Sequence, residues 1–177
     1  MIKDENIGSE VVFDGKILKV KVDTLAYNED RTVTREIVEA GSTVVILPID
    51  SECNVLLVRQ FRYPVRMTLL EAPAGRVEIG ETSIEAAQRE LREEVGYASR
   101  DIREVGSFWI SPGYCTEYMY AYVAKDLIPS KLQPDDDEDI VVERFPLDEA
   151  WNMVKSGDIQ DVKTIAILSM SGEITNS

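Results

Sequence analysis

The chain has 177 residues, 44% of them hydrophobic, which is enough for one domain with a buried core and no stabilising disulfides. Its formal net charge of −14 argues against a general surface for nucleic acids or anionic membranes, because such surfaces need basic residues. The sequence contains no histidine, which excludes histidine-based catalytic triads and histidine-ligated zinc. Acid–base chemistry therefore falls to carboxylates, lysine, tyrosine or a metal-bound water.

The sequence carries no apolar window of the length that a membrane span requires, and its polar start does not resemble a secretory leader. The two cysteines, Cys53 and Cys115, are far apart and form no CxxC pair, so a zinc or thioredoxin-type site is not indicated. We expect a cytoplasmic protein that binds neither membranes nor nucleic acids.

The first part of the chain predicts β-strands. Residues 10–40 read as extended, with apolar and polar residues alternating from Ile17 and a turn signal, NED, at 28–30. The continuously apolar run at 41–49 predicts a buried strand. A turn at 50–52 leads into a further strand at 54–64, and we expect these two strands to form a hairpin.

A helix is predicted from Thr82, which forms a capping-box pattern with Glu85. Gly96 stands where the helix is expected to end. The apolar face predicted by the helical spacing consists of Ile84, Ala87, Leu91 and Val95.

Further strands are predicted at 104–110, 117–124 and 139–147, followed by helices at 147–157 and 161–170. Mixed strands with helices outside them predict an α/β sandwich.

Three glutamates gather near the end of the predicted Thr82–Gly96 helix: Glu90, Glu93 and Glu94. Like charges at this spacing repel, and negative charge at a helix C-terminus opposes the macrodipole. Glu90 and Glu94 flank the apolar face, where an uncompensated charge is costly, and neighbouring Arg89 can hold one glutamate by a charge-assisted hydrogen bond. A divalent cation bound by oxygen ligands, Mg²⁺ or Mn²⁺, would remove the repulsion. A solvated acidic helix face remains the alternative interpretation.

The loop before the helix contains Gly75 and Gly80, which let the backbone bend sharply and approach a ligand. A backbone carbonyl there can supply another metal oxygen. Because protein-bound Mg²⁺ usually completes its shell with substrate phosphates and water, hydrolysis of a phosphate ester or pyrophosphate is the leading reaction class.

These residues resemble the Nudix box, G-x5-E-x7-R-E-U-x-E-E-x-G-U, where U is a bulky aliphatic residue. The matching positions are Gly75, Glu81, Arg89, Glu90, Leu91, Glu93, Glu94 and Gly96. Tyr97 is the one departure, since it is aromatic at the final U, a packing position.

The resemblance implies a Nudix fold, an α/β/α sandwich with a mixed β-sheet, and hydrolysis of a nucleoside diphosphate linked to another group. It implies that Glu90 and Glu94, with Glu93 close by, carry Mg²⁺, with Mn²⁺ as a possible substitute. The backbone carbonyl of Ala74 is the implied additional ligand. Arg89 would orient a glutamate and Glu81 would brace the loop.

Outside the box, the chain is similar to the ADP-ribose pyrophosphatase subgroup. The likeness lies in Pro112, sixteen residues after Gly96, in the segments LLEAPAG and VRQFRYP, and in the end of the chain from Glu138. It covers nearly everything from about residue 16. The implied reaction is Mg²⁺-dependent hydrolysis of ADP-ribose to AMP and ribose 5-phosphate.

The same resemblance implies substrate contacts. Arg62 would contact the pyrophosphate or terminal ribose, Glu71 would lie on the metal side, and Glu138 would help activate the attacking water. The substrate-binding candidates are Arg62, Phe61, Glu71, Arg35, Tyr27 and Arg76, with Phe61 or Tyr27 stacking on adenine. The alternative, more common for such residues, is that Phe61 and Tyr27 belong to the core, and Arg35 and Glu138 could be solvated charges.

The resemblance also implies a homodimer in which an N-terminal strand region, residues 1–40, is exchanged between subunits, beside a Nudix domain at 41–177. Arg35 would then reach the partner's substrate, although Glu39–Ala40 departs from the basic or aromatic residues common at that place. Other interpretations stay open: a Nudix hydrolase for NADH, a GDP-sugar or a dinucleoside polyphosphate, a non-catalytic ADP-ribose-binding module, or an acidic cation-binding domain.

Overall fold

The computed structural model describes residues 5–28, 31–133 and 140–172, and the chain forms two compact units. The first unit combines Met1–Ser42 with Trp109–Tyr118, and the second comprises Thr43–Phe108 and Met119–Ser177. The units therefore divide the chain differently from the boundary expected at residues 40 and 41. No helix in the described ranges is long and apolar enough to cross a membrane.

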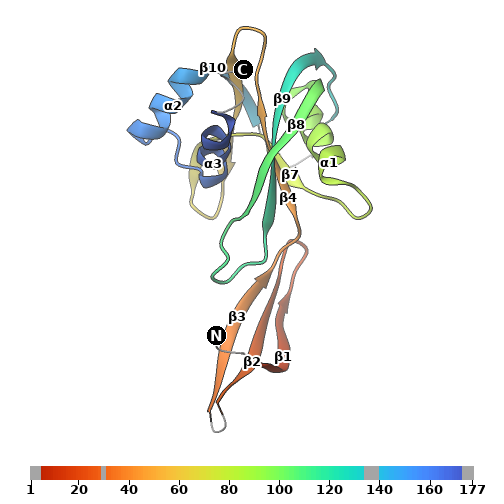
Figure 1. Ribbon diagram of the computed structural model, residues 1–177, viewed down its shortest axis with the longest axis vertical. Coiled ribbons are helices and arrows are strands. Elements are labelled where there is room, and N and C mark those ends of the chain that lie inside the picture. Colours follow the sequence, from red (N-terminus) through yellow and green to blue (C-terminus); the bar gives the residue numbers. More distant parts are fainter. Residues whose placement is uncertain (1–4, 29–30, 134–139, 173–177) are drawn as a thin grey trace. The chain divides into compact units, whose positions relative to one another are not determined.

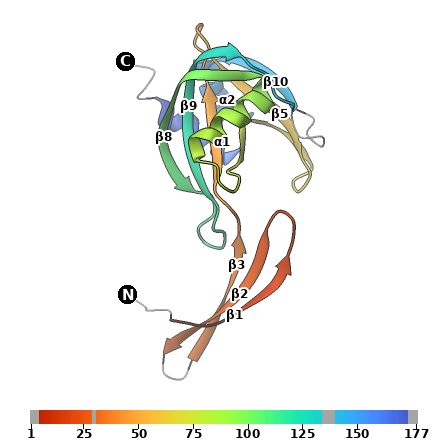
Figure 2. The ribbon, with the colours of Figure 1, turned by 90° about the vertical axis from the view of Figure 1, so that its right-hand side faces the viewer.

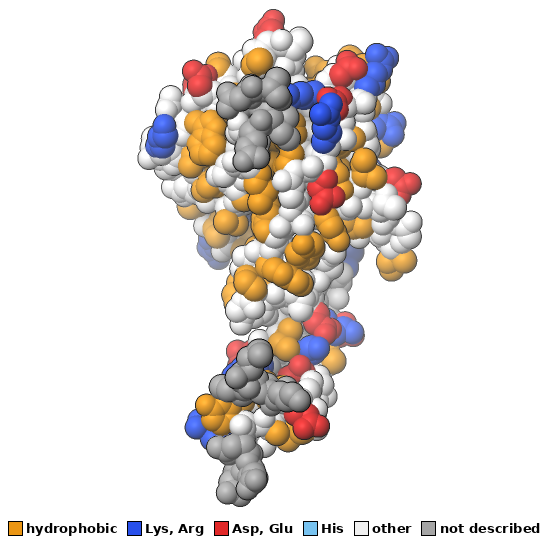
Figure 3. All heavy atoms as spheres, viewed as in Figure 1, with side chains coloured by type: hydrophobic (Ala, Val, Ile, Leu, Met, Phe, Trp, Pro, Cys, Tyr) orange, Lys and Arg blue, Asp and Glu red, His pale blue; other side chains and the backbone are white. Residues whose placement is uncertain are grey.

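The first unit is built on an antiparallel sheet of three strands in the order β1-β2-β3: β1 (Glu5–Asp14), β2 (Lys19–Asn28) and β3 (Arg31–Glu39). Strand β1 starts earlier than the sequence predicted. Its first residues are polar and show no alternation, so the sequence pattern did not indicate a strand there. Several apolar side chains of β1 are more than half exposed, namely Ile7, Val11, Val12 and Phe13. Figure 3 shows apolar side chains at the surface of this unit.

The segment Trp109–Tyr118 belongs to the first unit through backbone pairing with β3. The amide of Val38 donates to the carbonyl of Tyr114 at 2.7 Å, and the amide of Thr116 donates back to the carbonyl of Val38 at 3.0 Å. The Thr116 hydroxyl also bonds both the amide and the carbonyl of Ala40 at 3.0 Å. Two segments distant in sequence thus build this unit together.

The second unit contains two sheets (Figure 1). A four-stranded sheet has the order β7-β4-β9-β8, with β7 (Ala74–Arg76), β4 (Thr43–Pro48), β9 (Tyr118–Pro129) and β8 (Tyr97–Trp109). Strand β4 runs parallel to β9 and antiparallel to β7, so the sheet is mixed, as predicted. An antiparallel sheet has the order β10-β5-β6, with β10 (Ile140–Pro146), β5 (Asn54–Arg62) and β6 (Met67–Glu71).

The expected hairpin between 41–49 and 54–64 is wrong. Strands β4 and β5 lie in different sheets and share only an isolated bridge between Ile49 and Val55. The apolar residues at 44–47 are completely buried, which is typical of a central strand covered on both faces. Strand β4 therefore pairs with β7 and β9, while β5 takes β6 and β10 as neighbours.

Three α-helices flank the sheets: α1 (Ser83–Glu90), α2 (Leu147–Ser156) and α3 (Val162–Ser171). Helix α1 lies on one side and α2 and α3 on the other (Figure 1), and the turned view shows α1 crossing in front of the strands (Figure 2). Helix α2 ends at Gly157, as predicted, with φ of 85°. The arrangement is the α/β/α sandwich that the sequence predicted.

The core beneath α1 joins both sheets to the helix. Its buried members include Val44, Ile46, Leu56, Val58, Ala86, Ala87 and Leu91. Ile84 was predicted for this face but is 44% exposed, because the buried face of the short helix is centred on the two alanines and Leu91. Two small residues let α1 lie close to the strands, which brings its glutamates near the backbone of β7.

Candidate active site

A capped helix with an unusual last turn carries the acidic residues. The Thr82 amide donates to Glu85 Oε2 at 2.9 Å, and the Glu85 amide donates to Thr82 Oγ1 at 3.4 Å, so the predicted capping box is present. The α-helix ends at Glu90 and continues as a π-helical turn, Leu91–Val95, closed by Gly96 with φ of 82°. The sequence predicted an α-helix throughout. Single π-turns are frequent at functional sites, and the wider turn changes the direction of Glu94 relative to Glu90.

Two of the three glutamates are buried. Glu90 is 8% exposed and Glu94 is 7% exposed, while Glu93 is partly exposed. Removing a carboxylate from water is costly unless hydrogen bonds or an opposite charge compensate it. A solvated acidic face is therefore excluded for Glu90 and Glu94.

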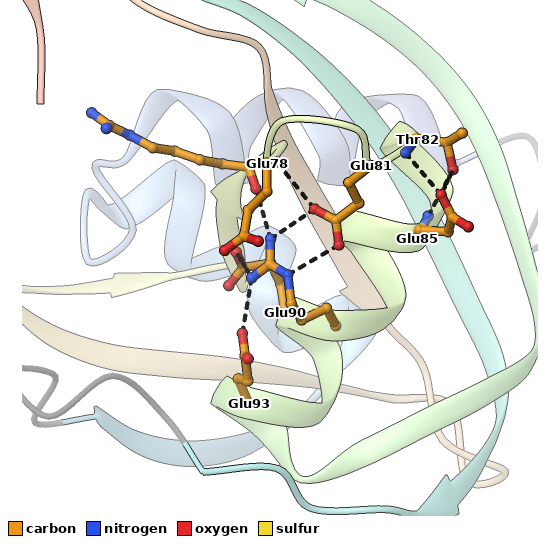
Figure 4. A network of polar contacts seen from close by, with 8 residues as sticks. Glu78, Glu81, Thr82, Glu85, Glu90 and Glu93 are labelled. Carbon is orange, nitrogen blue, oxygen red and sulfur yellow. Dashed lines mark hydrogen bonds and ion pairs between the residues drawn. The ribbon is translucent and has the colours of Figure 1, made fainter.

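Arg89 connects the helix to the preceding loop (Figure 4). Its Nη1 donates to Glu90 Oε1 at 2.7 Å and to Glu93 Oε2 at 2.9 Å. Its Nε and Nη2 donate to the two carboxylate oxygens of Glu81 at 3.1 Å each, and Nη2 also donates to the carbonyl of Arg76 at 2.8 Å. Arg89 thus joins Glu90 and Glu93 to Glu81 of the loop, while the predicted roles of Arg89 and Glu81 stay predictions.

The electrostatics of this network favour its charged state. Burial alone would lower the pKa of Arg89, but the hydrogen bonds to Glu81 and Glu90 raise it well above its usual value. The hydrogen bond from Arg89 lowers the pKa of Glu81. Arg89 and Glu81 therefore remain ionised at neutral pH.

The backbone of β7 lies against the two buried carboxylates. The amide of Ala74 donates to Glu94 Oε2 at 3.1 Å. A Cβ at Gly75 would lie only 1.8 Å from Glu90 Oε1, so no larger residue fits without displacing that side chain. The glycine predicted to allow a close approach allows it to the carboxylate of Glu90. The role of the Ala74 carbonyl as a metal ligand stays a prediction.

The oxygen donors of the acidic site are of the chemical type that binds a hard divalent cation. Glu90, Glu93 and Glu94 offer carboxylate oxygens beside the backbone of β7, which is the oxygen-only chemistry that Mg²⁺ and Mn²⁺ prefer. Within the described ranges, no three acidic or cysteine side chains are arranged so that they could hold a metal ion. In this arrangement Arg89 supplies the positive charge beside Glu90 and Glu93.

A second charged network joins β5, β6 and α3. Arg62 forms a bidentate ion pair with Glu71, in which Nε donates to Oε1 at 2.8 Å and Nη2 donates to Oε2 at 2.7 Å. Lys163 contacts the same Oε2 of Glu71, and its Nζ lies 2.9 Å from Asp161 Oδ2. Burial would raise the pKa of Glu71, which is only 1% exposed, but Arg62 and Lys163 lower it below its ordinary value.

Besides Asp161, the member of this network that the sequence did not predict is Lys163. It stands within the predicted helix 161–170, where a lysine in the first turn gives no signal of burial. Arg62, a predicted substrate ligand, is bound to Glu71 and keeps 40% of its side chain exposed.

The remaining candidates are Phe61, Tyr27, Arg35, Arg76 and Glu138. Phe61 is 54% exposed and Tyr27 is 40% exposed, so the alternative that they are core residues is wrong. Tyr27 and Arg35 belong to the first unit, where Arg31 lies 5.2 Å from the ring centre of Tyr27 and Arg35 donates to the carbonyl of Thr34. The Arg76 side chain is exposed. The prediction for Glu138 falls outside the described residues.

Comparison with known proteins identifies the class. The family model of the NUDIX domain matches residues 40–166, so this chain belongs to the Nudix family. The expectation of a Nudix pyrophosphohydrolase is confirmed at the level of class. Nudix hydrolases generally use divalent metal ions, which agrees with the oxygen donors of α1 and its π-turn.

Individual relatives are similar over most of their length. An ADP-ribose pyrophosphatase of Bacillus subtilis is 32% identical, over 92% of this chain and 89% of that protein. A methanol dehydrogenase activator of Bacillus methanolicus is 35% identical, over 93% and 90%. A crystal structure of an ADP compounds hydrolase superposes with a TM-score of 0.89 at 25% identity, covering 98% of this chain and 95% of the other.

Proposed function

We propose that this protein hydrolyses the pyrophosphate bond of ADP-ribose, with Mg²⁺, to give AMP and ribose 5-phosphate. The observation that carries the proposal is the buried pair Glu90 and Glu94, held against the backbone of β7 at Gly75. Two buried carboxylates beside a backbone that only glycine permits suit a cation that binds phosphate oxygens. The similarity to ADP-ribose pyrophosphatases across about nine-tenths of the chain supports the substrate.

In this proposal Glu90, Glu93, Glu94 and the carbonyl of Ala74 hold Mg²⁺, or Mn²⁺ in its place. The metal, when bound, neutralises the diphosphate and lowers the pKa of the attacking water. One water oxygen bonds to a phosphorus, the bridging P–O bond breaks, and the two products leave as phosphate monoesters. Arg89 keeps the glutamates oriented, and Glu138 is the proposed base that takes the water proton.

The remaining roles concern the substrate. Arg62 and Arg76 offer positive charge to the diphosphate or terminal ribose, Glu71 holds Arg62, and exposed Phe61 offers a ring for the adenine. Tyr27 and Arg35 would act on the substrate of a partner in an exchanged homodimer. The exposed apolar side chains of β1 support such an assembly, because they offer surface for burial. Both cysteines are free thiols, which agrees with a cytoplasmic location.

A substrate panel at fixed Mg²⁺ tests the proposal. ADP-ribose, GDP-mannose, NADH and a dinucleoside polyphosphate are each incubated with the protein, and released nucleoside monophosphate is measured by chromatography. We expect the highest kcat/KM for ADP-ribose. A higher kcat/KM for GDP-mannose would instead place the chain with the GDP-mannose pyrophosphatases to which it is 30–32% identical.

A binding module without activity makes a different prediction. Such a protein would bind ADP-ribose in the presence of Mg²⁺ and release no AMP. The complete set of Glu90, Glu93 and Glu94 together with Arg89 favours the enzyme, because a binder has no need to bury two carboxylates beside the diphosphate.

A further inference from the structure

Four alternating charges form a compact row between α3 and the end of β5. They run from Asp161 through Lys163 and Glu71 to Arg62. Lys163 is 9% exposed and Glu71 is 1% exposed, so the middle of the row is buried, while the Arg62 end reaches solvent. Such a buried lysine needs a reason, because its desolvation is costly.

The geometry shows what Lys163 changes at Arg62. Both Lys163 and Arg62 contact the same oxygen of Glu71, so the single charge of Glu71 is shared between two cations. Without Lys163, Glu71 would cancel the charge of Arg62 almost completely. With Lys163 present, the Glu71–Arg62 pair keeps positive charge at its exposed end.

The row lies close to the acidic site, because Glu71 stands three residues before Ala74, whose amide donates to Glu94 Oε2 at 3.1 Å. The hydrogen bond that Arg62 donates to Glu71 is the main cause that raises the pKa of Arg62, and the charges of Glu94 and Asp161 add to it. Arg62 therefore lies within electrostatic reach of Glu94, one of the proposed metal ligands. Two guanidinium nitrogens, Nε and Nη2, bond Glu71, and Nη1 makes no bond to any residue in the described parts of the chain.

We propose that Lys163 is a positioning residue that balances Glu71, so that Arg62 presents uncompensated positive charge to the diphosphate beside Glu94. The inference rests on the proposed function, and it adds to it a residue that does not touch the substrate. Asp161 has the opposite effect on the charge at Arg62, because its negative charge partly compensates the positive charge of Lys163.

A purely structural role for the row makes another prediction. Breaking a buried ion pair destabilises a protein whichever partner is removed. Stability would then fall in variants of Lys163 and of Asp161 alike, and any loss of binding would follow it. An electrostatic role instead moves ligand affinity in opposite directions for the two variants, although both lose stability.

The test compares Lys163→Met with Asp161→Asn. Asparagine keeps the side-chain oxygen that accepts from the Thr164 amide, and it is an equally good N-cap, so Asp161→Asn removes mainly charge. Lys155→Met in α2 is the control, because it removes one positive charge from an exposed position outside the row. The probe is α,β-methylene ADP-ribose, in which a CH₂ group replaces the bridging oxygen, titrated calorimetrically in Mg²⁺.

We expect the Kd of the probe to rise about tenfold in Lys163→Met, because the variant removes one positive charge from a row in which an effective dielectric constant of ~20 applies. It should fall in Asp161→Asn and stay unchanged in Lys155→Met. Thermal unfolding is recorded alongside. If Lys163→Met does not fold, the sign of the change in Asp161→Asn still decides.

Three outcomes would overturn the inference: an unchanged Kd in folded Lys163→Met, a higher Kd in Asp161→Asn, or an equal rise in Kd in the Lys155→Met control. The wild-type protein separates this from failure of the proposed function. If the wild type neither binds the probe nor releases AMP from ADP-ribose, both fail. If it does both and only the variants deviate from expectation, the inference alone fails.

Discussion

Replacing Gly75 by alanine puts a direct test on the packing of the acidic site. The new Cβ would lie 1.8 Å from Glu90 Oε1, whereas ordinary contacts begin at 3.4 Å, so the carboxylate must move by roughly 1.6 Å. Displacing a catalytic group by about 1 Å can cost on the order of 10²-fold in rate. We therefore expect kcat to fall by about 100-fold or more in Gly75→Ala.

The assay measures AMP release from ADP-ribose at saturating Mg²⁺, with the Mg²⁺ concentration then varied and thermal unfolding recorded. Gly41→Ala is the matched control, because a Cβ there meets no atom within 4 Å. Its rate should stay within about twofold of wild type, as for an unhindered surface substitution. A folded Gly75→Ala protein with wild-type kcat and Mg²⁺ dependence would refute the reasoning that this close approach fixes Glu90.

Three further results are expected. Glu94→Gln removes most turnover at saturating Mg²⁺ while exposed Glu36→Gln does not; near wild-type rates in the former would remove Glu94 from the metal site. Thr82→Ala lowers the free energy of unfolding by about 1 kcal/mol because the N-cap is lost, and Thr82→Ser restores it; equal stability of all three proteins in urea would contradict the cap. Because the pKa of Glu71 is lowered in the folded protein, its contribution is present above the unfolded value of 4.5 and is lost as the pH falls through the folded pKa. The stability difference between wild type and Glu71→Gln should thus be largest near neutral pH and shrink in acid, and a constant difference would exclude this linkage.

The acidic site was largely predictable because its signals are local. The capping box and the spacing from Glu81 to Glu94 lie on one loop and one helix, and the structure brings these residues together through Arg89. The π-turn was not predictable, since nothing in the residues Leu91–Val95 distinguishes it from an α-helix. Its conformation depends on packing that a linear pattern does not contain.

The errors and omissions concern contacts distant in sequence. The partners of β4 are β7 and β9, which start far along the chain, and an apolar run followed by a turn cannot reveal them. Lys163 likewise meets Glu71 across 92 residues. Pairing of this kind is decided by tertiary packing, so the sequence indicated the acidic cluster of Glu90, Glu93 and Glu94 and missed the pairing of Lys163 with Glu71.

The composition of the first unit has a practical consequence for dissecting the protein. Its two parts are separated by 66 residues of the second unit and are joined by backbone bonds between Val38 and the segment at 114–116. A fragment that starts after residue 42 would retain Trp109–Tyr118 but deprive it of β3, leaving the carbonyl of Tyr114 and the amide of Thr116 without their bonds to Val38. Removal of residues 1–42 is therefore a poor way to isolate the hydrolase, and single substitutions in the intact chain give cleaner comparisons.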